Sequence, residues 1–124
     1  MPSLSPDQNE SAYQIRSYEP GMLKINTLTL TQSVIITPNQ LIQDWPPQTI
    51  AELTRSSLDI ILSLKPHILL IGTGPSLIFP ELSIYGDLIN HGIGVEIMST
   101  RAACHTYHAL SAENRQVAAA LIIR

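Results

Sequence analysis

Two apolar runs in the second half of the chain, each followed by a turn and a helical pattern, constrain the fold most strongly. The first covers residues 67–71 and stops at Gly72, and the second covers residues 93–98 and stops at Ser99. The first run is apolar on both of its alternating faces, which is typical of a central strand covered on both sides. A helix that joins two such strands crosses over the sheet, nearly always right-handedly. We therefore predict that the first strand is central and parallel to the second, with the Gly72 and Ser99 ends together.

Three helices are predicted around these strands. The first begins with Thr54 as its N-cap and ends at Lys65-Pro66, because the residue before proline disfavours helical geometry. Leu58, Ile61 and Leu62 are expected on its buried face. The second runs from Pro80 to Gly92. Its inward-facing residues are predicted to be Leu82, Tyr85, Leu88 and Ile89.

The third helix is predicted to be capped by Thr100 and to reach about Glu113, where Asn114 can adopt the left-handed conformation that ends a helix. Residues 117–123 form a last strand. Upstream, residues 13–31 alternate apolar and polar side chains, which predicts half-buried antiparallel strands. Residues 34–36 form a short apolar run. Residues 38–48 are expected to be a loop whose Trp45 closes the core.

Length and composition favour a single α/β domain at residues 13–124, preceded by a flexible tail at residues 1–12. The start lacks the pattern of a signal or transit peptide, and no apolar run is long enough to span a bilayer. One cysteine cannot form an internal disulfide, which favours a reducing compartment. The sequence thus predicts a soluble, cytoplasmic protein.

The surface is expected to be poor in charge, because 44% of the residues are hydrophobic and 14% are charged, against a usual value of about 25%. Such a surface favours a protein partner or a homo-oligomer. The net charge is −3 and the seven Lys and Arg residues are scattered. Without a basic cluster to neutralise phosphates, nucleic-acid binding is disfavoured.

The Gly72-Thr73-Gly74 turn resembles a dinucleotide fingerprint only superficially. The third glycine of that pattern would fall at Leu77, and Pro75 removes an amide that a phosphate would need. The turn is interpreted as a site of close helix–strand packing. Binding of an anion or a small ligand by its amides remains the alternative.

Glu96 lies in the middle of an apolar strand, where a buried carboxylate is costly unless it is paired. We predict that it is inaccessible and paired with Arg115. Cys104 shares a helix face with Thr100 and His108, so it is a candidate nucleophile. Its small apolar neighbours instead favour a buried filler with neither an accessible sulfur nor a lowered pKa. A metal site built from Cys104, His105 and His108 is disfavoured because adjacent helical residues diverge by about 100°. No metal or cofactor is predicted.

Several segments together resemble one family: Ile71-Gly72-Thr73-Gly74, Gly94-Val95-Glu96-Ile97-Met98, Ala102-Ala103-Cys104, Thr106-Tyr107, Glu113-Asn114-Arg115 and Val117-Ala118-Ala119-Ala120-Leu121. This is the single-domain family of undefined biochemistry that includes mitochondrial respiratory complex I assembly factor 3 and its bacterial and archaeal relatives. The resemblance implies three layers around a mixed five-stranded sheet with helices on both faces, plus a small N-terminal antiparallel β portion. It also implies an assembly or interaction role.

The sequence therefore leaves two hypotheses for the function of the protein. The leading hypothesis is a non-catalytic interaction domain, an assembly factor for a respiratory or other membrane-associated complex. The alternative is a small-molecule-binding protein or an enzyme that uses a cleft between the Gly72–Gly74 turn and residues 98–104. The candidate cleft residues are Gly72, Thr73, Gly74, Glu96, Met98, Thr100, Cys104 and Arg115. A filled cleft with an exposed apolar patch elsewhere favours interaction, whereas polar atoms converging on an open pocket favour the alternative.

Overall fold

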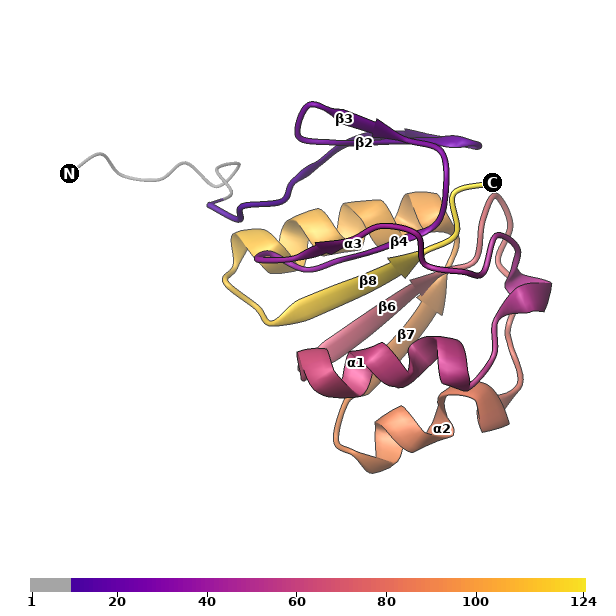
Figure 1. Cartoon of the computed structure of the whole chain (residues 1–124). Coiled ribbons are helices and arrows are strands. Elements are labelled where there is room, and N and C mark those ends of the chain that lie inside the picture. The colour runs from indigo at the N-terminus through magenta and orange to yellow at the C-terminus, as the bar shows by residue number, and fades with distance from the viewer. Residues whose placement is uncertain (1–9) are drawn as a thin grey trace.

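The strands form two separate sheets in the computed structural model, which describes residues 10–124 (Figure 1). The smaller sheet is antiparallel and consists of β1 (Ile15–Glu19), β2 (Met22–Ile25) and β3 (Leu28–Leu30). The larger sheet has the order β5-β4-β8-β6-β7. Its strands are β4 (Val34–Ile36), β5 (Leu41–Ile42), β6 (Ile68–Gly72), β7 (Gly94–Met98) and β8 (Val117–Leu121). Most of the predicted tail, residues 1–9, lies outside the described residues.

The predicted arrangement of the two apolar strands is confirmed. Strand β6 lies between β8 and β7 and is parallel to both. Gly72 is opposite Met98 in β7 and Leu121 in β8, so the carboxyl ends of all three strands meet at one edge. Strands β4 and β5 are antiparallel to each other, and β4 is antiparallel to β8. The mixed five-stranded sheet with a separate small antiparallel sheet is thus as the resemblance implied.

The helices cover both faces of the larger sheet (Figure 1). On one face lie α1 (Asp59–Leu64), which follows the 3₁₀ turns Ile50–Glu52 and Ser56–Leu58, and α2 (Leu82–Asn90). On the other face lie α3 (Thr100–Ala112) and the small sheet. No helix in the described part of the chain has the length and apolar character needed to cross a bilayer.

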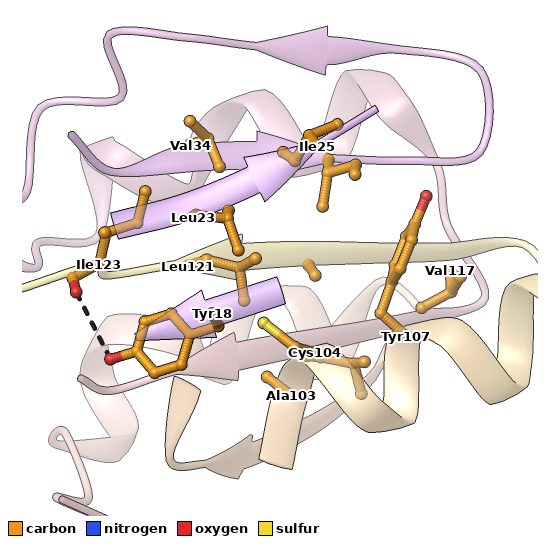
Figure 2. Packing of buried hydrophobic residues seen from close by; sticks show 13 residues of the cluster. Tyr18, Leu23, Ile25, Val34, Ala103, Cys104, Tyr107, Val117, Leu121 and Ile123 are labelled. Carbon is orange, nitrogen blue, oxygen red and sulfur yellow. Dashed lines mark hydrogen bonds between the residues drawn. The ribbon is translucent and has the colours of Figure 1, made fainter. Parts of the chain in front are cut away.

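Strand β8 supplies both halves of the core because alternate residues of a strand point to opposite faces. Val117, Ala119 and Leu121 pack toward α3 and the small sheet, whereas Ala118 and Ala120 pack toward α1 and α2. The alanines let the helices approach the sheet closely. Figure 2 shows the half of the core that faces α3, with Tyr18 and Leu23 of the small sheet beside Leu121 and Ile123.

Trp45 closes the half of the core that faces α1 and α2, as predicted. Its side chain is buried against the α1 face of the sheet, and its Nε1 donates a hydrogen bond of 2.8 Å to the carbonyl oxygen of Ser57. The surrounding loop differs in one respect from the prediction. Residues 41–42 form the short strand β5, which pairs with β4 and borders the sheet.

The starts of two helices differ from the prediction. Ser99, not Thr100, is the N-cap of α3, and its Oγ accepts a hydrogen bond of 3.3 Å from the amide of Ala102. Thr100 is the first helical residue and is fully buried. The predicted first helix is divided, because 3₁₀ geometry continues to Leu58 before α1 begins.

Helix α2 buries a narrower face than predicted. Leu88 is buried, and Ile84 and Tyr85 are half-buried, but Leu82 and Ile89 are 63% and 47% exposed. The prediction that Leu82 and Ile89 face inward was therefore wrong. At 100° per residue the apolar residues of the helix span an arc of about 160°, and only the part of this arc around Ile84 and Leu88 faces the sheet.

Candidate functional site

The parallel strands bring the turn after β6 against the start of α3, where the alternative hypothesis placed a cleft. The amide of Thr73 donates to the carbonyl oxygen of Met98 at 2.9 Å, and the amide of Thr100 donates to the carbonyl oxygen of Gly74 at 2.9 Å. The turn and the helix are therefore joined directly through their backbones.

The side chain of Thr100 joins the same turn to the end of β8. Its Oγ1 accepts a hydrogen bond of 2.8 Å from the amide of Gly74 and donates one of 2.6 Å to the carbonyl oxygen of Ile122. The amide of Ile122 in turn donates to the carbonyl oxygen of Gly72 at 3.0 Å. These polar groups satisfy one another inside the fold, so they do not face a ligand.

Gly72 is needed for this close packing. A Cβ atom at Gly72 would lie 2.9 Å from Oγ1 and 3.0 Å from Cα of Thr100. Gly74 has a φ of +99°, and a Cβ there would lie 3.1 Å from the carbonyl oxygen of Arg124. The space between the turn and α3 is therefore filled by protein atoms, in agreement with the interpretation of the turn as a packing site.

Thr73 organises the loop that leaves the sheet. Its buried hydroxyl donates to the carbonyl oxygen of Ser76 at 2.6 Å and accepts from the amide of Ile78 at 3.2 Å. Both bonds close a tight loop over residues 73–78. Thr73, a polar residue of the candidate cleft, therefore holds the shape of this loop.

The end of this loop and the residues that follow it expose large apolar side chains. Phe79 is 69% exposed, which makes it the most exposed large hydrophobic residue described in the chain. We define the apolar surface as the exposed side chains of this loop and of α2: Leu77, Ile78, Phe79, Leu82 and Ile89. Sequence reasoning missed this surface, although three consecutive apolar residues between Pro75 and Pro80 were a usable signal.

Two candidate cleft residues lie elsewhere. The prediction that Glu96 is buried and paired with Arg115 was wrong, because the Glu96 side chain is exposed. Strand β7 is an edge strand, so its middle is incompletely covered. Arg115 precedes β8 and therefore lies at the amino end of the parallel strands, opposite the end that holds Gly72. Met98 is half-buried, and its Sδ accepts a hydrogen bond from Thr106.

Cys104 is the buried filler that the sequence predicted. The residue is 5% exposed and packs among Tyr18, Ala103 and Tyr107 (Figure 2). Burial raises the pKa of its thiol to about 12, although the nearby Arg101 guanidinium acts in the opposite direction. A thiol in this state is protonated at neutral pH, so it lacks the thiolate character of a nucleophile.

Four cavities of the described residues lie away from most of the candidate cleft. Of the eight candidate residues, Cys104 and Arg115 are the two that line one of these four. Cys104 borders a cavity of about 230 Å³ between β1 and α3, and Arg115 borders one of about 690 Å³ near the start of β8. Within residues 10–124, no three His, Cys, Asp or Glu side chains gather as metal ligands.

We predict that the protein loses stability at alkaline pH. Burial raises the pKa of Cys104, Tyr18 and Tyr107 above their ordinary values. The folded state therefore retains protons that the unfolded state releases above about pH 9, and stability falls as the pH rises from there toward 12. Each group contributes at most about 1.4 kcal/mol per pH unit. Urea unfolding at pH 7, 9 and 10.5 measures this, and Cys104→Ala should reduce the slope. Equal stability at pH 7 and 10.5 would contradict the prediction.

Comparison with known proteins gives three likenesses that span most of the chain. A family model described as "Protein of unknown function (DUF498/DUF598)" matches residues 15–122. The "13 kDa major membrane protein" of Francisella tularensis is 29% identical over 98% of this chain and 100% of its own length. A solution structure of a Xanthomonas campestris protein is 34% identical, covers 98% of this chain and 89% of its own, and superposes with a TM-score of 0.82.

A further relative carries a functional name. It is the "NADH dehydrogenase [ubiquinone] 1 alpha subcomplex assembly factor 3" of Danio rerio, 34% identical over 87% of this chain. The chain spans 63% of the length of that relative. The likeness therefore concerns one part of the longer protein.

Proposed function

This chain belongs to the DUF498/DUF598 family of proteins of unknown function, and on that basis we propose that it is a protein-interaction domain of the assembly-factor type. Its apolar surface docks on a subunit of a membrane-associated complex before that subunit is fully assembled. The domain holds the partner through contact and carries out no chemical step.

The main support for this proposal is that polar groups satisfy one another at the candidate cleft, while apolar groups are exposed beside it. The amide of Thr73 bonds to Met98, and Gly74 and Thr100 bond to each other and, through the Thr100 hydroxyl, to Ile122 at the end of β8. The neighbouring apolar surface remains accessible to a partner. Exposed clusters of large apolar side chains typically mark interaction sites.

The geometry of the loop suits docking. Because the Thr73 hydroxyl bonds to the backbone on both sides of residue 77, the loop is held before a partner arrives. A preorganised surface loses less conformational entropy on binding than a flexible one. Fully burying a side chain such as Phe79 or Leu82 contributes roughly 1.5–3 kcal/mol. A few such anchors are enough for a specific contact.

The partner class is supported by the names of the relatives. One is named as an assembly factor of NADH dehydrogenase and another as a membrane protein. An unassembled subunit of a membrane complex exposes apolar surface that its neighbours will later cover, and such surface complements this one. The single cysteine is buried and unpaired, which fits action in the reducing cytoplasm.

We expect that replacing Phe79 and Leu82 together by aspartate abolishes partner binding without unfolding the protein. Both side chains are mostly exposed, so the change in folding stability should stay near 0.5 kcal/mol per site. The tagged variant, expressed in the native host, should recover a membrane-complex subunit from detergent-solubilised membranes at least tenfold less efficiently than the parent. Quantitative mass spectrometry and the level of the assembled complex provide the two measurements.

A matched control comes from the small sheet. Met22 and Leu28 are also large, apolar and exposed, but they lie on β2 and β3. Aspartate at both of these positions should leave recovery of the subunit unchanged. If the Phe79/Leu82 variant recovers the subunit as well as the parent does, this surface is not the docking site. If light scattering shows that the parent is a dimer and the variant is a monomer, a second copy of the chain is the occupant instead.

A further inference from the structure

A groove on the other side of the larger sheet has a different character from the apolar surface. It lies between β1 and the first half of α3 and has a volume of about 230 Å³. The Tyr18 ring, Ile15 and the buried Cys104 give it an apolar part. We call it the basic groove because its remaining lining residues are Arg16, Ser17, Arg101, His105 and His108.

The basic groove gathers basic side chains in an acidic chain. Its two arginines and two histidines are four of the eleven basic side chains, which comprise seven Lys and Arg and four His. No Asp or Glu of the described part of the chain lines it. Among residues 10–124 the structure contains one ion pair, Arg55–Asp87, so neither Arg16 nor Arg101 has a carboxylate partner there. Unneutralised guanidinium groups at a recess attract anions and bind carboxylates or phosphates through two parallel hydrogen bonds.

Arg101 is held in place for such a contact. Its guanidinium carbon lies 5.4 Å from the centre of the Tyr18 ring, within the range of a cation–π contact. The ring is itself fixed, because Tyr18 is buried and its hydroxyl donates to the carbonyl oxygen of Ile123 at 3.4 Å. A guanidinium stacked in this way keeps its N–H edge available to a ligand and loses little rotamer freedom when the ligand binds.

We propose that the basic groove binds a small amphipathic anion, a carboxylate that carries a few apolar carbon atoms. The carboxylate contacts Arg16 and Arg101, and the apolar carbons lie along Ile15 and the Tyr18 ring. The volume sets the size of the ligand, since pockets for drug-sized molecules hold about 300–1,000 Å³. The groove therefore fits a small molecule better than a helix or strand of a partner protein.

The test is an NMR titration of the ¹⁵N-labelled full chain with three probes: hexanoate, acetate and hexan-1-ol. Hexanoate combines charge with apolar carbons, acetate retains the charge, and hexan-1-ol retains the carbons. We expect hexanoate to shift the amide signals of residues 15–18 and 101–108 saturably. It should bind at least tenfold more tightly than either of the other probes, because each of them lacks one of the two contacts.

Three variants complete the experiment. Arg101→Gln should weaken hexanoate binding at least tenfold, and Ser17→Tyr should block it by filling the groove while both arginines remain. Lys24→Gln is the matched control, because Lys24 is a basic, exposed residue of the adjacent strand β2 that does not line the groove. It should bind like the parent. If Arg101→Gln does not fold, Ser17→Tyr still decides the question.

Three outcomes would overturn the proposal. Binding of hexan-1-ol as tight as that of hexanoate would mean that the groove does not recognise charge. Unchanged hexanoate affinity in both Arg101→Gln and Ser17→Tyr would place the site elsewhere. A short glutamate-rich peptide that shifts the same signals and binds more tightly than hexanoate would identify an acidic protein segment as the occupant instead.

Discussion

Replacing Thr100 by valine should destabilise the protein by about 3 kcal/mol, although the two side chains have nearly the same shape. Valine cannot accept from the amide of Gly74 or donate to the carbonyl oxygen of Ile122. Both backbone groups would be buried without a partner, at a cost of roughly 1–3 kcal/mol each. For a domain of this size the loss corresponds to a fall in melting temperature of about 10–15 °C.

Calorimetry or urea unfolding of the Thr100→Val protein measures this effect. Thr106→Val is the control, because Thr106 lies on the same helix, is half-buried and bonds only to the weak acceptor Sδ of Met98. Its stability should change by less than about 1 kcal/mol. If both variants unfold alike, the hydroxyl of Thr100 does not hold the turn, α3 and β8 together.

A second large effect is expected when a single methyl group is added at Gly72. In Gly72→Ala the new Cβ would meet both the side chain and the backbone of Thr100 at 3.0 Å or less. A side chain can rotate away, but a backbone atom moves only if α3 shifts from β6. We therefore expect a loss of about 3 kcal/mol, the upper end of the usual cost of overpacking.

The same substitution at Gly86 should have the opposite sign. Gly86 lies inside α2, and the nearest heavy atom to its Cβ position is 3.9 Å away. Alanine fits there and restricts the unfolded chain, so Gly86→Ala should stabilise the protein by about 0.5–1 kcal/mol. Thermal unfolding of the two variants side by side checks both signs. A Gly72→Ala protein as stable as the parent would show that the turn and α3 have room between them.

The parallel pair β6 and β7 could be predicted from the sequence because the information is local. Two apolar runs joined by a helical pattern leave one common arrangement, and it does not depend on distant residues. The position of β7 at the edge is not local, since it depends on which strand pairs with β8. That is why the burial of Glu96 was predicted wrongly: the apolar residues around it indicated a strand but not how far α3 covers it.

The apolar surface and the basic groove could not be predicted from the sequence, for two different reasons. The apolar arc of helix α2 is wider than the face that the sheet covers, so the position of the helix over the sheet decides which of its apolar residues are buried, and Leu82 and Ile89 lie outside that face. The basic groove joins Arg16 to Arg101, which are 85 positions apart in the chain. No periodicity or motif connects them. Only the docking of β1 beside α3 brings them together.

The place of β8 has a consequence for how the chain folds as it leaves the ribosome. This strand follows all the others in the sequence, yet it lies between β4 and β6. Until residues 117–121 emerge, β4 and β5 have no connection to β6 and β7, and the apolar faces of both halves lack their common partner. Until then the apolar faces of both halves stay exposed on the nascent polypeptide, and a truncation that removes residues 117–123 leaves two unjoined halves of a sheet.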